Sequence, residues 1–279
     1  MEVRIRPNRS WVSVDWAGLW QYRDLLFLLV RKDFVSRYSQ TILGPLWSLI
    51  QPLVTTLLFT VIFGNFGKMP TDGLPPLLFY LCGMLPWSYF AATFNGTSST
   101  LLNNAGLFGK VYFPRLLVPI SATLSCLIPL LIQSVMFAAF WCYYKYQNLT
   151  GPALHFGGAT AILPLIAFQV GALGLGFGLW MSALTAKYRD FLQVSAFVVN
   201  VWMYATPVVF PLSMIPEERR WIVMLNPMTM PVEAFKLILL GQGTVTLSHC
   251  LASLFVTMIV FCSGVFVFQH VERTFVDVI

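Results

Sequence analysis

Long runs without a charged residue constrain this chain more than any other feature of its sequence. Six such runs occur, and each can hold the ~20 residues that a helix needs to cross a hydrocarbon core about 30 Å thick. An Asp, Lys or Arg at the centre of a membrane helix costs roughly 2.5–3.5 kcal/mol on insertion scales, so the charges mark where spans end. The runs cover residues 38–67, 73–109, 116–144, 146–186, 191–216 and 237–271.

Composition agrees with a membrane protein and excludes several other classes. Charged residues make up 10% of the chain, whereas about 25% is usual in soluble domains. The net charge of +6 comes from basic residues at the edges of the apolar runs, which is a topology signal and not the basic stripe of a nucleic-acid-binding protein. We therefore expect no nucleic-acid partner. Disorder, a disulfide scaffold and a conventional soluble enzyme are also excluded.

The runs, trimmed at Gly, Pro and Asn, predict an all-α integral membrane protein with six transmembrane helices. Helices are required because backbone that faces lipid must satisfy its own hydrogen bonds. We expect a cytoplasmic N-terminus with an interface helix over 1–38, a transmembrane domain over 39–271 and a cytoplasmic tail over 272–279. The spans are expected near residues 42–63, 74–95, 117–143, 160–184, 191–210 and 247–269.

The distribution of Lys and Arg predicts the orientation. With the N-terminus inside, the inner segments carry twelve of these residues and the outer loops carry five. By the positive-inside rule both termini are cytoplasmic. Residues 1–24 contain no continuous apolar segment, so no signal peptide is expected. The five basic residues assigned to the outside are Lys68, Lys145, Arg219, Arg220 and Lys236.

Residues 15–38 have the pattern of an amphipathic helix that lies on the inner membrane surface. Apolar residues recur at mostly three- and four-residue steps, and charged residues fall between them, as an interfacial helix requires. The residues expected to meet lipid headgroups are Trp16, Trp20, Arg23, Arg31, Lys32 and Arg37.

The segment 211–246 is too apolar for an ordinary loop and too broken for a span. Prolines and glycines divide it into pieces such as 217–225 and 231–240, each well short of membrane thickness. We predict short re-entrant or surface-lying helices here. Irregular backbone at such depth needs protein or a water-filled cavity beside it, which makes this segment a candidate gate.

The chemistry of an enzyme is not indicated. The predicted spans contain no Asp, Glu, Lys or Arg, so no proton relay or ion-coupling site is expected, and the five cysteines lack metal-binding spacing. The glycine cluster at 171–178 lies inside a span without a preceding strand, so we interpret Gly174 and Gly178 as a small-residue face for helix packing. The string GLFGK that ends at Lys110 lacks the first glycine of a Walker A loop, so ATP is not expected to bind this chain in the usual way.

Uncharged polar and aromatic residues in the spans have two interpretations. One is hydrogen bonding between helices, or packing against neighbours and lipid. The other is an uncharged lining along which a polar neutral solute slides without deep traps. The candidate lining residues are Trp47, Gln51, Thr55, Trp180, Asn200 and Tyr204.

Two short inner loops combine basic and aromatic residues. Topology anchoring explains their positive charge, but it does not explain aromatic residues that would be exposed there. A short apolar and charged knob is typical of a docking contact with a cytosolic partner. The residues concerned are Lys110, Val111, Tyr112, Phe113, Pro114 and Arg115 in the first loop, and Lys187, Tyr188, Arg189 and Asp190 in the second.

Read with their surroundings, these loops resemble the ABC-2 type permease family, in the branch that exports O-antigen and related cell-surface polysaccharides. The resemblance covers roughly residues 20–270, and six motifs occur in the family's order and spacing. The motifs are RYSQTILGPLWSLIQP at 37–52, LCGMLPWSYF at 81–90, NAGLFGKVYFPRLLVPIS at 104–121, GLWMSALTAKYRDF at 178–191, YATPVVFPLSMIPEERRW at 204–221 and LNPMTMPVEAFKLILLG at 225–241.

The resemblance implies a homodimer of six-span subunits in a bacterial inner membrane. Two cytosolic nucleotide-binding subunits would carry the ATP, the Mg²⁺ and the ATPase activity, so this chain would be no enzyme and hold no cofactor or metal. The two inner loops would be the contacts that couple it to the ATPase, and the N-terminal helix would be the interface helix. The implied outer gate comprises Pro207, Pro211, Trp221, Asn226 and Pro227.

The expected function is export of a lipid-linked polysaccharide through a channel at the homodimer interface, with the lipid anchor guided by the basic interface helix. One alternative is an ABC-2 exporter of another cargo, such as teichoic acid, a lipid or a drug. A second is a membrane enzyme acting on polyprenyl lipids, which would need paired acids or a His cluster at one membrane face. The nearest acids, Glu217 and Glu218, stand beside Arg219 and Arg220 and indicate a solvated helix start.

Overall fold

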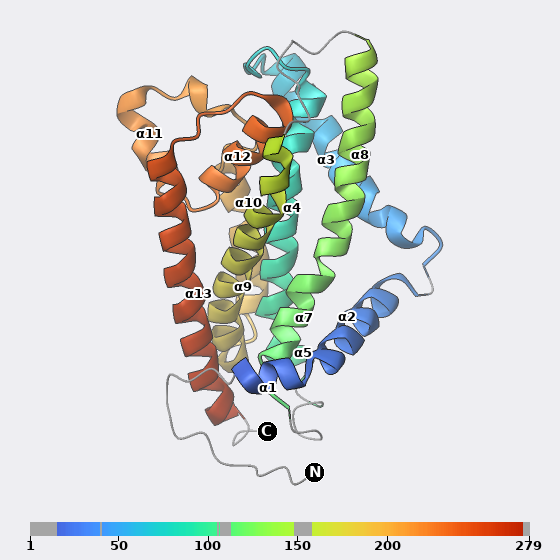
Figure 1. The fold of residues 1–279 in the computed structure, drawn as a ribbon, viewed down its shortest axis with the longest axis vertical. Coiled ribbons are helices and arrows are strands. Elements are labelled where there is room, and N and C mark those ends of the chain that lie inside the picture. The colour runs from blue at the N-terminus through green and yellow to red at the C-terminus, as the bar shows by residue number, and fades with distance from the viewer. Residues whose placement is uncertain (1–15, 40, 105, 107–112, 148–157, 276–279) are drawn as a thin grey trace.

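The computed structural model describes residues 16–39, 41–104, 106, 113–147 and 158–275, and within them every regular element is helical. Helices α4, α9 and α13 run alongside one another, and α8 flanks α4 (Figure 1). The elements are α1 (Trp16–Gln21), α2 (Arg23–Tyr38), η1 (Gly44–Leu46), α3 (Trp47–Phe59), η2 (Thr60–Phe66), α4 (Pro76–Ser98), α5 (Thr100–Asn103), α7 (Leu117–Ser125), α8 (Leu127–Tyr146), η3 (Gly158–Ile162), α9 (Leu163–Lys187), α10 (Phe191–Tyr204), η4 (Leu212–Met214), α11 (Glu217–Met224), α12 (Thr229–Leu240) and α13 (Leu247–Phe275).

Five of the six predicted spans are confirmed as helical stretches long and apolar enough to cross a membrane. Each lies within a few residues of its predicted position, because charge and proline limit the helices in the structure as they do in the sequence. The stretches are Gly44–Phe66, Pro76–Ser98, Leu117–Tyr146, Ala159–Lys187 and Leu247–Glu272.

The helix predicted over 191–210 is shorter in the structure than a full span. Helix α10 ends at Tyr204 after 14 residues, which is about 21 Å of helix at 1.5 Å per residue and falls short of the membrane core. Beyond it the chain turns through Pro207 and Pro211, which cannot donate the hydrogen bonds that a continuing helix needs. Residues 206–209 are buried although they are not helical.

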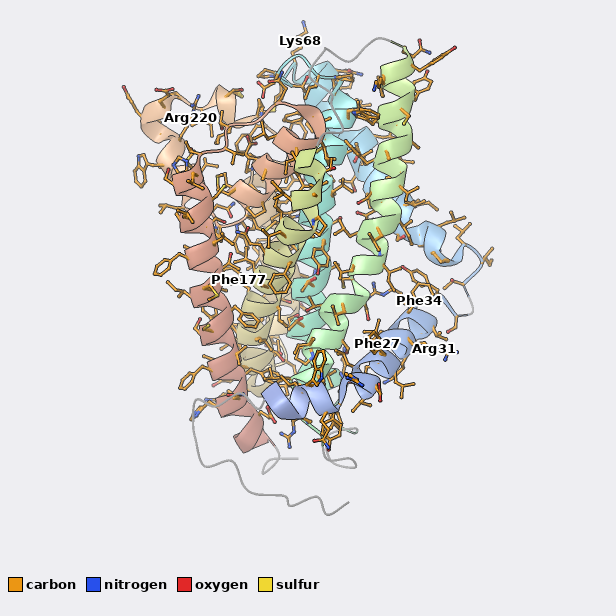
Figure 2. All side chains as sticks on the ribbon, in the orientation of Figure 1. Phe27, Arg31, Phe34, Lys68, Phe177 and Arg220 are labelled. Carbon is orange, nitrogen blue, oxygen red and sulfur yellow. The ribbon has the colours of Figure 1, made fainter. Side chains whose placement is uncertain are left out.

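The charged residues separate toward the two ends of the bundle. Figure 2 shows Arg31 near the end where α1 and α2 lie, and Lys68 and Arg220 at the opposite end. The last turns of α13 reach the same end as α1 (Figure 1). Arg31, which the sequence assigns to the inside, thus lies at the opposite end of the structure from Lys68 and Arg220, which it assigns to the outside.

Helix α4 is the centre of the fold. Sixteen of its 23 residues are buried, against three of the 23 residues in the first span, Gly44–Phe66. It is surrounded by an upper cluster of buried side chains, which includes Phe79, Tyr80, Phe90 and Phe94 of α4 itself. A lower cluster, nearer α1 and α2, contains Leu29, Leu101, Phe113, Leu117, Leu179 and Phe268.

Glycines let α9 approach two neighbours closely, as the small-residue pattern predicts. A Cβ at Gly178 would lie 2.6 Å from Cβ of Thr97 on α4, and one at Gly174 would lie 3.0 Å from Cβ of Thr93. On another face, a Cβ at Gly176 would lie 2.9 Å from backbone atoms of Phe261 on α13. Small residues that bring backbones together drive helix association in membranes.

Gly176→Ala should therefore destabilise the bundle by about 1–3 kcal/mol, because overpacking against backbone atoms forces the helices apart. Gly96→Ala is the matched control, since a Cβ there meets only the Cβ of Ala122 at 3.8 Å, and alanine is the better helix former. Thermal unfolding of the purified chains in the same detergent measures both effects. Equal melting temperatures for the two variants would contradict this view of the α9–α13 contact.

Candidate functional site

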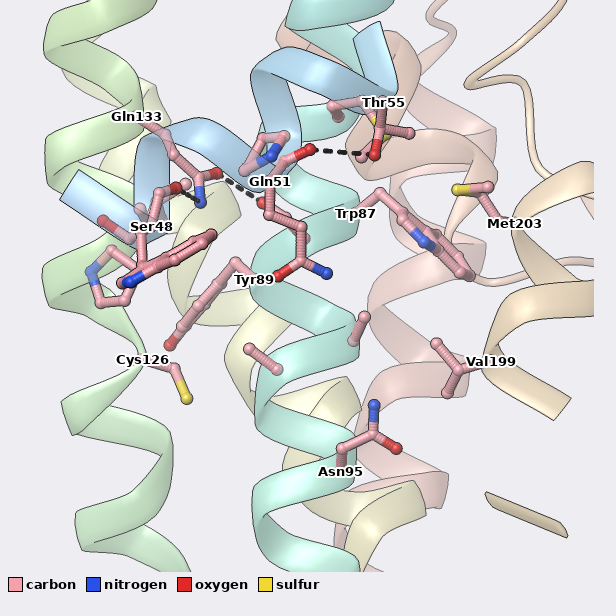
Figure 3. A pocket seen from close by; sticks show the side chains of 18 of the residues that line it. Ser48, Gln51, Thr55, Trp87, Tyr89, Asn95, Cys126, Gln133, Val199 and Met203 are labelled. Carbon is pink, nitrogen blue, oxygen red and sulfur yellow. Dashed lines mark hydrogen bonds between the residues drawn. The ribbon is translucent and has the colours of Figure 1, made fainter. Parts of the chain in front are cut away.

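A cavity of about 560 Å³ lies between α3, α4, α8 and α10, with the C-terminal end of α2 at one side (Figure 3). We call it the groove. Arg37 is the only charged side chain among the lining residues that the structure describes. The polar and aromatic lining residues are Arg37, Tyr38, Trp47, Ser48, Gln51, Thr55, Trp87, Ser88, Tyr89, Asn95, Gln133 and Asn200.

A chain of hydrogen bonds fixes one wall of the groove. Ser88 Oγ on α4 donates to Gln133 Oε1 on α8 at 2.6 Å, and Gln133 Nε2 donates to the carbonyl of Ser48 on α3 at 3.1 Å. Gln133 is buried, so losing either partner would leave an unpaired amide in an apolar setting. The three helices are thereby held in register around the groove.

Three amide side chains remain exposed along the groove on three different helices. Gln51 comes from α3, Asn95 from α4 and Asn200 from α10, and Gln51 and Asn95 project into the same hollow (Figure 3). Each amide offers two N–H donors and a carbonyl acceptor. With the exposed Trp47 also lining the groove, they suit a neutral solute rich in hydroxyl groups.

Four of the six residues predicted to line a channel line the groove, and two do not. Trp47, Gln51, Thr55 and Asn200 are among the lining residues. Trp180 instead packs beside Phe177, with ring centroids 5.3 Å apart. The exposed Tyr204 lies near Phe59, with centroids 6.4 Å apart.

Asn95 and Gln133 are lining residues that the prediction did not include. An uncharged amide inside an apolar run was the available signal for both. Periodicity alone cannot show which face of a wholly buried helix meets a cavity. Among the described residues, no group of three His, Cys, Asp or Glu is placed to hold a metal ion.

The N-terminal segment is helical, but it forms two helices with a break at Tyr22 instead of one. Leu29 of α2 is buried in the lower cluster against α7, whereas Trp20 is 72% exposed. Figure 2 shows how Phe27, Arg31 and Phe34 lie along α2. Arg23, Arg31, Lys32 and Arg37 are exposed, and the side chain of Trp16 lies outside the described residues.

Asp33 joins α2 to the third span beside the groove. Ser125 Oγ donates to Asp33 Oδ2 at 3.4 Å, and Arg37, one turn further along α2, lines the groove. Partial burial raises the pKa of Asp33, although the charges of Lys32 and Arg37 and the bond from Ser125 oppose the shift. The carboxylate is thus held in a site that disfavours its charge.

A raised pKa in the folded state means that this carboxyl group favours folding when protonated, and that the contribution is lost as the pH rises above about 4. Asp33→Asn removes the titration. We expect its melting temperature to exceed that of the parent chain at pH 7–8, and the difference to shrink toward pH 4. Asp24→Asn, at a residue whose side chain is 92% exposed, is the control. A difference for Asp33→Asn that stays constant with pH would contradict the assignment.

In the first inner loop, the expectation of exposed aromatic side chains is wrong for Phe113. Phe113 is 6% exposed and belongs to the lower cluster. Arg115 Nη1 donates to the carbonyl of Glu272 at 2.6 Å, and its Nε lies 3.6 Å from Glu272 Oε1. These side chains attach the loop to α13, and Pro114 between them is half-buried. Lys110, Val111 and Tyr112 lie outside the described residues.

The second inner loop keeps an exposed aromatic knob. Tyr188 is 54% exposed, and the ammonium group of Lys187 lies 5.3 Å from the centre of its ring. Arg189 and Asp190 are also exposed. Here the structure presents the surface that the sequence predicts.

The segment expected to form an outer gate is a bent pair of helices. Helices α11 and α12 meet at 111°, and Asn226 at the turn ties them to α10. Its Oδ1 accepts from Trp202 Nε1 at 3.0 Å, and its Nδ2 donates to Thr206 Oγ1 at 2.8 Å. Pro207 and Pro211 are buried, Pro227 is half-buried and Trp221 is 62% exposed.

The same region contains a buried ion pair that the sequence reasoning missed. Lys236 Nζ lies 3.4 Å from Glu233 Oε1, and both residues are 2% exposed. Lys236, which the sequence counts among the basic residues of the outer segments, is therefore buried within α12. Opposite charges three residues apart in an otherwise apolar helical segment were the signal that could have identified the pair.

These features define a multi-pass helical membrane protein with a groove whose lining within the spans is uncharged, and with a bent helix pair over one end. Residues 24–240 match the ABC-2 type transporter family. The chain belongs to that family.

Individual relatives agree over most of the chain. It is 26% identical over 222 residues to the O-antigen export system permease protein RfbA of Myxococcus xanthus, covering 79% of this chain and 82% of that protein. A protein of the same name from Klebsiella pneumoniae is 25% identical over 262 residues, covering 92% and 95%. The polysialic acid transport protein KpsM of Escherichia coli is 24% identical over 213 residues, covering 75% and 78%.

Proposed function

We propose that this chain is the permease subunit of an ATP-driven exporter that moves a lipid-linked, O-antigen-like polysaccharide across the bacterial inner membrane. The groove carries the proposal, because its exposed amides and aromatic faces match the hydroxyl groups and flat apolar faces of sugar rings. The relatives named as O-antigen export permeases support this cargo class.

The low charge of the groove suits a moving polymer. A passage conducts only when its sites bind weakly enough to release, and neutral hydrogen bonds exchange readily with those of water. Gln51, Asn95 and Asn200 could each hold a sugar hydroxyl without a strong ionic trap. Arg37 lies at the end of the groove formed by α2.

A homodimer would complete the passage. In a single chain the groove amides are exposed, and exposed apolar side chains flank them on α3 and α10, among them Leu57, Leu58, Phe197 and Val201. Two copies facing each other through these helices would enclose both grooves. Each copy would then contribute one wall of a channel.

The energy would come from two separate cytosolic subunits that bind ATP and Mg²⁺. In this proposal the exposed loop at Lys187, Tyr188, Arg189 and Asp190 makes a direct docking contact. The first loop transmits movement in a different way, because Phe113 and Arg115 attach it to the lower cluster and to α13. The basic residues of α2 would meet membrane lipids and guide the lipid anchor of the glycan.

Replacing two groove amides with Gln51→Leu and Asn200→Leu should lower export about tenfold, a loss that corresponds to ~1.4 kcal/mol of interaction with the cargo. Surface polysaccharide is measured in a strain that carries only the variant chain. The control is Gln147→Leu, at an exposed amide just after α8 that does not line the groove. Normal export by the double variant would refute the groove as the path.

An affinity pull-down from gently solubilised native membranes tests the partner. We expect an ATPase with a Walker A motif to co-purify, and Tyr188→Ala to reduce its recovery several-fold, because interface aromatics are common hot spots. A differently tagged second copy of the chain should also co-purify. Tyr143→Ala, an exposed tyrosine on α8 at the other end of the bundle, is the control. A chain recovered alone and without ATPase activity would refute the proposal.

A further inference from the structure

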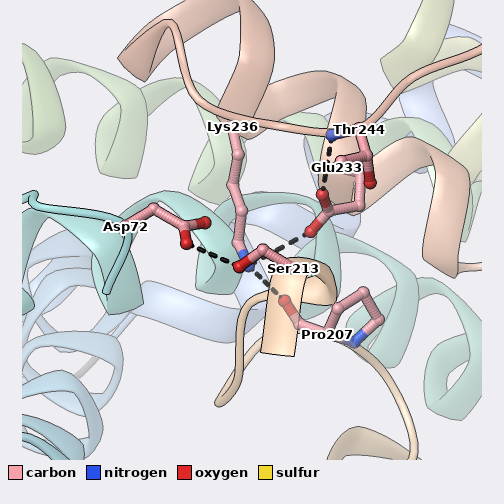
Figure 4. A network of polar contacts seen from close by, with 6 residues as sticks. All are labelled: Asp72, Pro207, Ser213, Glu233, Lys236 and Thr244. Atoms are coloured by element: carbon pink, nitrogen blue, oxygen red, sulfur yellow. Dashed lines mark hydrogen bonds and ion pairs between the residues drawn. The ribbon is translucent and has the colours of Figure 1, made fainter. Parts of the chain in front are cut away.

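The buried ion pair of α12 also contacts groups outside that helix. The ammonium group of Lys236 has three N–H donors. It donates to the carbonyl oxygen of Pro207 and pairs with Glu233 Oε1 at 3.4 Å (Figure 4). It also lies 3.9 Å from the centre of the Phe79 ring on α4. These three groups come from three separate parts of the chain.

The carbonyl of Pro207 is a group that the fold must satisfy. It lies just beyond the end of α10, in a non-helical segment whose residues 206–209 are buried. A buried backbone carbonyl without a partner is costly. The segment also packs tightly on α4, since a Cβ at Gly83 would lie 3.2 Å from Cα of Val208.

Glu233 extends the same network to the start of the last span. Its Oε2 accepts a hydrogen bond from the backbone N–H of Thr244 at 3.3 Å. The chain can fold back against α12 here because Gly241 ends that helix in the left-handed conformation, with φ of 70°. Next to this network, Ser213 Oγ donates to Asp72 Oδ1 at 2.6 Å, which joins the loop before α4 to η4 (Figure 4).

We propose that Lys236 is a positioning residue for transport, and that its pair with Glu233 fastens the turn after α10 to α4 and α12. The wall of the groove formed by Val199, Asn200 and Met203 lies in α10 directly before this turn. Holding Pro207 therefore sets the position of that wall at the outer end of the helix. The link to transport rests on the proposed function, whereas the fastening itself does not.

The use of charge is consistent with positioning. A buried ion pair often stabilises a fold no better than apolar residues of the same volume. An ammonium group can, however, direct separate donors at a carbonyl, a carboxylate and a ring, which a methionine cannot do. Lys236 should thus matter for the position of the turn more than for the stability of the bundle.

The experiment measures cysteine labelling in isolated membranes that contain the full chain. The native cysteines are replaced, and a single cysteine is introduced by Val208→Cys, at a residue with no exposed surface. We expect Lys236→Met to raise the rate of labelling by N-ethylmaleimide at least about tenfold, because removing one partner of a buried pair strongly favours local opening. A rate unchanged from the chain with Lys236 overturns the proposal.

Two controls separate local opening from general damage. Leu179→Cys places the single cysteine in the lower cluster, where the residue is fully buried, and Lys236→Met should leave its labelling slow. Fast labelling at both sites would mean general unfolding and would overturn the positioning role. Glu217→Gln breaks an ion pair of the same i,i+3 spacing on α11, where Glu217 is 89% exposed, and should change neither rate.

If Lys236→Met fails to accumulate, the double variant Glu233→Met with Lys236→Met restores an apolar pair. It should still label Val208→Cys faster than the parent, since Pro207 has lost its donor. Slow labelling of the double variant overturns the proposal. Surface polysaccharide measured in the same strains tests the link to transport. Fast labelling of Val208→Cys together with full export would refute that link. Loss of export in the groove-amide variants would support the proposed function independently of Lys236.

Discussion

The need to satisfy buried backbone polar groups is the constraint on which the rest of this structure depends. A helix meets it alone, so the chain crosses the membrane core as helices wherever it can. Where prolines stop α10 after Tyr204, side chains from elsewhere take over: the Asn226 amide bonds to the residues that follow the helix, and Lys236 bonds to the carbonyl of Pro207. The bent helices α11 and α12 hold these two side chains in place. These hydrogen bonds hold α11 and α12 over the end of α10.

The same bundle combines a tightly packed side with an open one. Glycines on α9 let α4 and α13 approach closely, and this side forms a continuous apolar core. On the other side, α3 and α10 are only partly buried, and their amide side chains are exposed in the groove. The closely packed helices α4, α9 and α13 thus support the exposed side formed by α3 and α10, which is open to a solute or to a second copy of the chain. This division is consistent with the transport role proposed above.

Much of the site was predictable because uncharged polar side chains stand out inside apolar runs. Gln51, Thr55 and Asn200 were identified in this way, and Trp47 with them. Trp180 was not separable from them, because an aromatic residue in a buried helix packs against neighbours as readily as it lines a cavity. Phe113 shows the opposite error: a short basic loop suggests exposure, yet this side chain completes the lower cluster.

By itself the sequence determined the number of apolar segments, the ends of five spans and the separation of charges between the two ends of the bundle. These are local properties, because the cost of placing a charge in lipid or a proline in a helix depends on the residue and its near neighbours. Only the tertiary structure decided that Arg115 meets Glu272, 157 positions away, and that Lys236 is buried against Pro207 and Phe79. Such contacts depend on which helix faces meet. The packing of all the helices together sets those faces, and no single segment encodes them.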